Sequence, residues 1–147
     1  MTTNFDLIEI AKKLKLKYFK GVFMKDQIID NKDLLKDNCS FILNFEDSSK
    51  QGSHWTLFYK KGNEKIFYDS YGTHVPIEIQ KLFGSNILYT NFQTQKFNSD
   101  ICGEMCLLIC YLLDNSQKEF GQGPHEQSKS LHQAFVDIIL DMFCDVL

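Results

Sequence analysis

The sequence predicts one α+β domain that spans residues 1–147. Helical patterns near both ends of the chain enclose a block of short strands that are rich in aromatic residues. Apolar residues make up 44% of the chain, and 13 Phe and 6 Tyr indicate a core built largely of rings. We therefore expect a central mixed or antiparallel sheet with helices packed against it.

The spacing and length of apolar stretches predict the helices. Apolar residues recur at helical spacing over Asn4–Leu16, and Thr3 or Asn4 is the expected N-cap. The apolar stretch Ile101–Leu113 is too long for a typical strand and predicts a buried helix. The other expected elements are a strand over Phe41–Phe45, a short helix over Pro76–Phe83, a strand over Ile87–Phe92 and a last amphipathic helix from Ser128 or Ser130 to Met142.

The clearest structural signal is a β-hairpin. Residues 54–60 and 65–71 are rich in β-forming side chains, and Gly62-Asn63 between them is typical of a two-residue turn. With that turn, His54 and Asp69 lie on one face as diagonal neighbours, about 7–8 Å apart at the backbone. The carboxylate can then accept a hydrogen bond from the imidazole, which sets the tautomer and favours the charged ring.

Cys102 lies where the apolar helix is expected to begin. The free N–H groups and partial positive charge of a helix N-terminus lower the pKa of a thiol, although Asp100 opposes this effect unless it caps the helix. If His54 reaches the sulfur, the two groups form an ion pair that prepares a nucleophile. Gly103 permits close approach of the backbone to a ligand. The Gln95 amide and the backbone N–H of Cys102 could together hold a developing oxyanion.

Structural explanations compete with each of these assignments. A histidine in an aromatic strand can be a core or edge residue, and the helix cysteines can be small apolar core residues. Cys102, Cys106 and Cys110 are too far apart along a helix axis to share one zinc ion, so we expect neither a metal nor another cofactor. Five cysteines, an odd number, argue against a disulfide framework and favour a reducing compartment.

The charge distribution predicts weak nucleic-acid binding or none. The net charge is −3, and all 16 basic residues are Lys, so the bidentate forks of Arg are missing. Six Lys lie within Lys12–Lys25, and we interpret this stretch as a solvated helix face. No apolar run approaches the ~20 residues of a membrane span and no secretory signal opens the chain, so we expect no contact with a membrane.

Four short motifs occur in an order and spacing that resemble a known family. They are Gly52-Ser53-His54-Trp55, Phe67-Tyr68-Asp69-Ser70-Tyr71-Gly72, Gln95, and Asn98-Ser99 followed by Cys102-Gly103. This sequence resembles the adenovirus-type maturation cysteine proteases (adenain-like) and, more distantly, the SUMO-deconjugating proteases of the same clan. The resemblance implies their fold, in which the helix that carries the nucleophile packs on the sheet.

The resemblance also implies a role for each motif residue. Cys102 would be the nucleophile, His54 the general base and acid, and Asp69 the residue that orients the imidazole. Gln95 and the backbone N–H of Cys102 would form the oxyanion hole. Trp55 and Asn44 would contact the substrate, Trp55 as a wall of the narrow channel for a Gly-containing cleavage site.

The function implied is that of a viral maturation cysteine endopeptidase. Such an enzyme would cleave capsid and core precursor proteins at Gly-Gly or Gly-X sites through a thioester intermediate. It would act in the virion and inside the infected host cell, in a cytoplasmic virus factory or in the nucleus. A virophage or Polinton-like genome is the expected source. A peptide activator would not be disulfide-linked, because no Cys lies between Cys39 and Cys102 to match the family's link.

Three alternatives stay open on the sequence alone. A ubiquitin- or SUMO-like deconjugating protease would share the fold and differ in its leaving group. An acetyltransferase of the same clan would use the same Cys and His, and would need a coenzyme A site. A non-catalytic binding module would retain the residues without the reaction.

Overall fold

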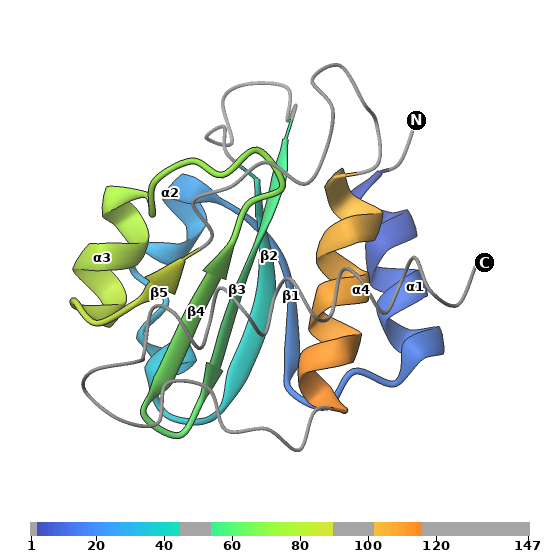
Figure 1. Cartoon of the computed structure of the whole chain (residues 1–147), viewed down its shortest axis with the longest axis horizontal. Coiled ribbons are helices and arrows are strands. Elements are labelled where there is room, and N and C mark those ends of the chain that lie inside the picture. Colours follow the sequence, from blue (N-terminus) through green and yellow to red (C-terminus); the bar gives the residue numbers. More distant parts are fainter. Residues whose placement is uncertain (1–2, 45–53, 90–101, 116–147) are drawn as a thin grey trace.

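A five-stranded mixed sheet with the strand order β1-β2-β3-β4-β5 forms the centre of an α+β fold (Figure 1). The computed structural model describes residues 3–44, 54–89 and 102–115. The inner strand pairs, β2–β3 and β3–β4, are antiparallel, whereas β1–β2 and β4–β5 are parallel. The strands are β1 (Phe19–Met24), β2 (Cys39–Asn44), β3 (Trp55–Lys61), β4 (Glu64–Tyr68) and β5 (Leu88–Tyr89).

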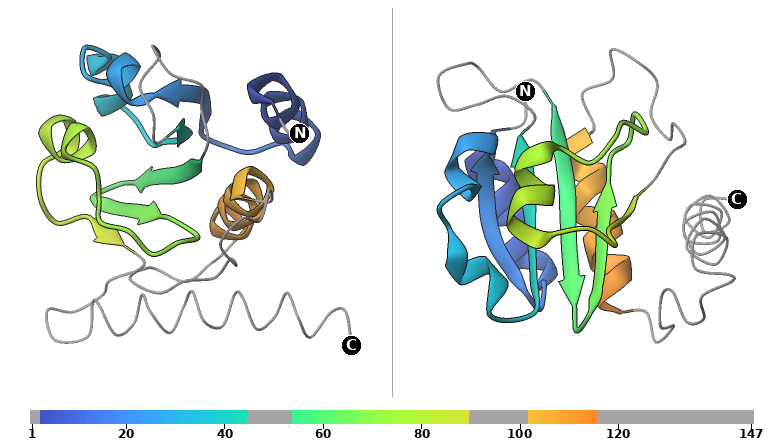
Figure 2. Two further views of the ribbon diagram at one scale, coloured as in Figure 1. Left: turned by 90° about the horizontal axis from the view of Figure 1, so that it is seen from above. Right: turned by 90° about the vertical axis from the view of Figure 1, so that its left-hand side faces the viewer.

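Helices cover both faces of the sheet, as the view from above shows (Figure 2). One face carries α1 (Asn4–Leu14) and α4 (Cys102–Asp114), which also contact each other. The other face carries α2 (Lys25–Ile28), the 3₁₀ helix η1 (Lys32–Leu35) and α3 (Ile77–Phe83). The sheet is therefore the middle layer of three.

Two apolar cores result from the alternation of side chains along the central strands. On the α1–α4 side, the sheet contributes the buried residues Ile42, Leu57, Tyr59, Ile66 and Tyr68. On the α3 side, it contributes Phe41, Leu43, Phe58 and Phe67. Because both faces are covered, β2 is buried along its whole length.

The structure confirms most of the expected elements within the described residues. Thr3 caps α1 through its side chain, and α3 covers much of the predicted Pro76–Phe83 helix. The hairpin has the predicted register, since Lys61 pairs with Glu64 across Gly62-Asn63. Of the predicted Ile87–Phe92 strand, Leu88 and Tyr89 form β5, and residues 90–92 lie outside the described residues. The predicted helix that ends at Met142 lies outside the described residues.

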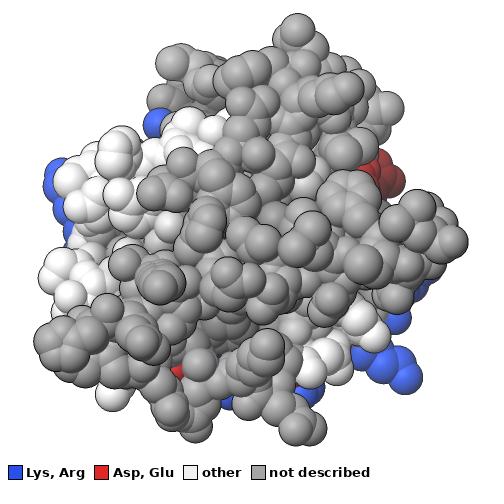
Figure 3. Space-filling view, in the orientation of Figure 1, with Lys and Arg blue, Asp and Glu red and all other residues white. Residues whose placement is uncertain are grey.

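The interpretation of Lys12–Lys25 as one helix face is wrong. α1 ends at Leu14, and Lys15 adopts a left-handed conformation with a φ of 54° that stops the helix. The same stretch then forms β1, an edge strand that the sequence patterns did not predict. Figure 3 shows lysine side chains at the lower right edge of this view, where the last turn of α1 lies in Figure 1.

In the described part of the chain, no helix has the length and apolar character that a membrane crossing requires.

Candidate active site

The open end of the hairpin brings His54 and Asp69 together. His54 directly precedes β3 and Asp69 directly follows β4, so the register of the hairpin places both at the same end of the sheet. The His54 Nε2–H donates to Asp69 Oδ1 at 2.6 Å, and the Asp69 carboxylate is fully buried. The predicted pairing of carboxylate and imidazole is therefore present, with Nε2 as the ring nitrogen that the carboxylate holds.

A tight loop after β4 fixes the Asp69 carboxylate. The Tyr71 N–H donates to Oδ1 at 2.9 Å, which is the oxygen that also binds His54. The Thr73 N–H donates to Oδ2 at 3.2 Å, and the Thr73 hydroxyl donates to the same oxygen. Gly72 supports this turn with a φ of 74°, a conformation that favours glycine. Both oxygens are thus engaged, and the carboxylate cannot rotate without losing several hydrogen bonds.

Cys102 lies at the first position of α4, at the end of the sheet where β3 begins (Figure 1). Its thiol lies close enough to the His54 ring and to the backbone N–H groups of Trp55 and Gly103 for all three to lower its pKa. Since Nε2 of His54 binds Asp69, Nδ1 is the ring nitrogen left for the sulfur. Asp69, His54 and Cys102 therefore lie in series, with the imidazole hydrogen-bonded to the carboxylate on one side and coupled electrostatically to the thiol on the other.

The electrostatics of these three groups favour a charged Cys–His pair. Burial disfavours the imidazolium, but the hydrogen bonds and charges of Asp69 and Cys102 outweigh it and raise the pKa of His54 to about 9. Burial also disfavours the thiolate, but the hydrogen bonds from His54, Trp55 and Gly103 outweigh it and lower the pKa of Cys102. The two titrations are coupled, and both directions stabilise thiolate beside imidazolium at neutral pH.

Tyr71 covers one face of the imidazole. The rings of Tyr71 and His54 are stacked, with centroids 4.2 Å apart and planes inclined by 10°. An aromatic face attracts a cation, so this stacking favours the imidazolium over the neutral ring and limits the ring's tilt. No pattern in the sequence predicts these roles of Tyr71 and Thr73.

The structure gives Gly103 a packing role. A Cβ at Gly103 would lie 2.8 Å from Leu7 Cδ2 and 3.4 Å from Trp55 Cε3, so the missing side chain lets α4 pack closely on α1 and β3. The sequence predicted that the backbone at Gly103 approaches a ligand closely, whereas in the structure it approaches Leu7 and Trp55 of the core. Within the described residues, nothing indicates a ligand at this glycine.

Trp55 and Asn44 lie opposite each other, where β2 ends and β3 begins. Trp55 is 9% exposed and belongs to the core on the α1–α4 side, and its indole N–H donates to Asn4 Oδ1 at 3.2 Å. Asn44 is buried at the end of β2. Their predicted contacts with a substrate stay predictions. Gln95, the predicted oxyanion donor, lies outside the described residues.

The other described cysteines differ from Cys102 in their environment. Burial raises the pKa of Cys39 to about 11 and that of Cys110 to about 12, and it raises the pKa of Cys106 well above its usual range. The Cys106 thiol donates to the Trp55 carbonyl at 3.4 Å, and the Cys110 thiol donates to Ser40 Oγ. All three thiols are therefore core residues, as one of the two sequence interpretations predicted for Cys106 and Cys110.

No protein-family model matches the chain, and no curated protein matches it either. In the described residues, no group of three or more His, Cys, Asp or Glu side chains is placed to hold a metal ion. The chemistry of the site rests on its own geometry.

Proposed function

We propose that this protein is a cysteine endopeptidase in which Cys102 is the nucleophile, His54 is the general base and acid, and Asp69 orients the imidazole. The observation that supports this proposal is the buried Asp69–His54 hydrogen bond beside Cys102 at the start of α4, where the imidazole and the thiol shift each other's pKa toward the charged forms. A buried carboxylate, an imidazole of raised pKa and a thiol of lowered pKa are the requirements of a prepared thiolate nucleophile.

The first half of the reaction is acyl transfer to sulfur. The Cys102 thiolate attacks the carbonyl carbon of the scissile peptide bond and forms a C–S bond, while negative charge moves to the carbonyl oxygen. The N–H groups in the first turn of α4 lack intrahelical partners and can stabilise this oxyanion. The His54 imidazolium gives its proton to the leaving nitrogen, the C–N bond breaks, and a thioester remains.

The second half is hydrolysis of the thioester. Neutral His54 takes a proton from water as the water oxygen attacks the thioester carbon. The C–S bond then breaks, the acid product leaves, and the Cys102 thiolate is restored beside the imidazolium. Asp69 stays ionised throughout, because its hydrogen bonds hold its pKa below the usual range despite its burial.

The motif order shared with the adenovirus-type maturation proteases narrows the proposal. On that resemblance we propose the adenain-type fold, a viral origin, and cleavage of capsid or core precursors at Gly-containing sites. Small residues at the cleavage site suit a groove that larger side chains cannot enter.

The test is cleavage of protein substrates by the wild type and by the Cys102→Ala variant. Mass spectrometry of a proteome-derived mixture should find new amino termini with wild type, enriched after Gly, and none with Cys102→Ala. Cys110→Ala is the matched control, because it removes the same atom from a core position of the same helix and should retain cleavage. Cleavage by the Cys102→Ala variant, or no new termini with wild type, would contradict the proposal.

The same protein samples distinguish the alternatives. Rapid release of a fluorophore from the carboxyl terminus of ubiquitin or SUMO, without cleavage of other proteins, would favour a deconjugating protease. Binding of acetyl-CoA in a titration would favour an acetyltransferase.

A further inference from the structure

A concave surface lies at the other end of the sheet from Cys102. β3 begins beside His54 and ends at Lys61, so the hairpin turn is remote from the candidate active site (Figure 1). Around this turn lies a cavity of about 520 Å³, which we call the lysine pocket. Three segments line it: residues 17–20 at the start of β1, residues 36–38 before β2, and the hairpin itself.

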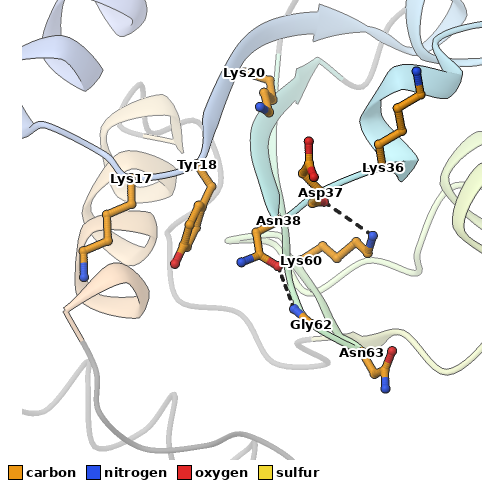
Figure 4. A pocket seen from close by; sticks show the side chains of 9 residues that line it. All are labelled: Lys17, Tyr18, Lys20, Lys36, Asp37, Asn38, Lys60, Gly62 and Asn63. Carbon is orange, nitrogen blue, oxygen red and sulfur yellow. Dashed lines mark hydrogen bonds between the residues drawn. The ribbon is translucent and has the colours of Figure 1, made fainter.

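Positive charge dominates the lining of the lysine pocket. Lys17, Lys20, Lys36 and Lys60 line it, and Asp37 is the acidic residue among the lining side chains. Figure 4 shows Lys17 on one side, Lys36 and Lys60 on the other, and Lys20 between them. Such a lining offers little to an apolar ligand and attracts an anion.

Hydrogen bonds hold three side chains of the pocket lining in place, and the Lys17 ammonium is held at one side, on the Asp114 carbonyl at 2.9 Å. The Lys60 ammonium donates to the carbonyls of Leu35 at 2.9 Å and Asp37 at 3.4 Å, which position its charge without neutralising it. Asn38 Oδ1 accepts a hydrogen bond from the Gly62 N–H at 2.8 Å. With its oxygen engaged by the hairpin turn, the Asn38 side chain presents its NH₂ group as the donor to a ligand.

Lys20 supplies an uncompensated charge. No carboxylate within residues 3–44, 54–89 and 102–115 forms an ion pair with it, whereas Lys36 pairs with Asp33 at 3.1 Å in an exposed position. Burial raises the pKa of Cys39, and the charges of Lys60 and Lys20 oppose that rise. Both ammonium groups therefore act on the same point at the start of β2, next to the pocket.

We propose that the lysine pocket binds a compact anion that carries two or more phosphate groups. The cavity volume lies within the range of small-molecule sites, and lysine ammonium groups are common ligands of phosphate. Asp33 and Asp37 interrupt the positive charge beside Lys36, which favours a compact anion over a nucleic-acid strand that continues across this side. Binding at this pocket does not depend on the proposed protease activity.

The probe is pyrophosphate, titrated into the full chain by calorimetry at low ionic strength, where charge screening is weak. We expect a dissociation constant below about 1 mM. Asn38→Asp keeps the acceptor for the Gly62 N–H and replaces the NH₂ donor with a negative oxygen. This variant should weaken binding by about tenfold or more, because a hydrogen bond to a charged ligand becomes a repulsion.

Lys20→Gln provides a second variant, which should weaken binding by about fivefold. Its matched control is Lys81→Gln, the same change at an exposed position of α3, which should leave binding unchanged. The backbone amide of Gly62 should shift in the NMR spectrum on addition of pyrophosphate. Circular dichroism of each variant checks that the fold is retained, and either pocket variant alone suffices for the test.

Titrations with other anions show which kind of phosphate compound the lysine pocket prefers. Inorganic phosphate should bind more weakly than pyrophosphate, and a short DNA duplex should bind no better than pyrophosphate at equal phosphate concentration. The proposal is overturned if pyrophosphate gives neither heat nor amide shifts, or if Asn38→Asp and Lys20→Gln bind as wild type does. Tight duplex binding that displaces pyrophosphate would replace the compact anion with nucleic acid as the ligand.

Discussion

Replacing Asp69 with Asn should make Cys102 a much poorer nucleophile at neutral pH. Asn keeps the shape of the side chain and can still accept hydrogen bonds through Oδ1, but it removes the negative charge behind the imidazole. The pKa of His54, raised to about 9, should fall toward its ordinary value of 6.5. At pH 7 the Cys102 thiolate then loses its cationic partner.

The magnitude follows from the fraction of thiolate. Without the imidazolium, the pKa of Cys102 should return to its ordinary value of 9.0 or above, since burial raises it. At pH 7 the thiolate fraction then falls to about 1% or less. A thiolate of higher pKa is intrinsically more reactive, which offsets part of this loss. We therefore expect alkylation of Cys102 to slow by about tenfold.

The assay is iodoacetamide labelling between pH 5 and pH 10, with the modified cysteine identified by peptide mapping. In the wild type, Cys102 should be labelled at pH values well below 9, whereas Cys39, Cys106 and Cys110 should be protected by burial and raised pKa values. Proteolysis should rise with pH as the thiolate forms and fall above about pH 9, where His54 loses its proton. Equal labelling rates for wild type and Asp69→Asn at pH 7 would refute the reasoning.

Three further substitutions test particular contacts. Thr73→Val removes the hydroxyl that binds Asp69 Oδ2 and should lower kcat by about tenfold with little change in KM. Thr73→Ser keeps the hydroxyl and should retain the kcat of the wild type. Equal kcat values for the wild type and both variants would exclude a positioning role for Thr73. Gly103→Ala should lower the free energy of unfolding, measured by urea denaturation, by about 1 kcal/mol, because the clash with Leu7 exceeds the gain in helix propensity. The same substitution in a Leu7→Ala background should cause no such loss. Asp114→Ala should lower the free energy of unfolding by at least about 2 kcal/mol, because it leaves the Tyr59 hydroxyl and the Lys17 N–H without their acceptor. An unchanged midpoint of urea denaturation would contradict this.

The hairpin and the start of α4 could be predicted because short-range rules govern them. A Gly-Asn turn sets the strand register, and that register places His54 and Asp69 at one end of the sheet. The apolar stretch after residue 100 similarly predicts a helix whose first described residue is Cys102. Cys102 and His54 belong to segments that are far apart in the sequence, so local rules do not predict that they lie close together. The order of the motifs, which resembles that of a known protease family, suggested their proximity.

Other features depend on tertiary structure and left no local pattern. β1 contains Lys20 and Gly21, which are unfavourable in a buried strand, and its position as a parallel edge strand makes them acceptable. Thr73 reaches Asp69 because Gly72 turns the chain with a positive φ. The path of that loop depends on where β4 ends, which the residues of the loop do not determine by themselves.

The anchoring of α4 at both ends has a consequence for covalent inhibitors. At one end Gly103 packs on Leu7, and at the other end the carboxylate of Asp114 accepts a hydrogen bond from the backbone N–H of Lys17. A helix held in this way cannot slide along its axis to meet an electrophile. The noncovalent part of an inhibitor must therefore place its electrophilic group next to the Cys102 sulfur. The length and shape of that part should determine potency more than the intrinsic reactivity of the electrophile does.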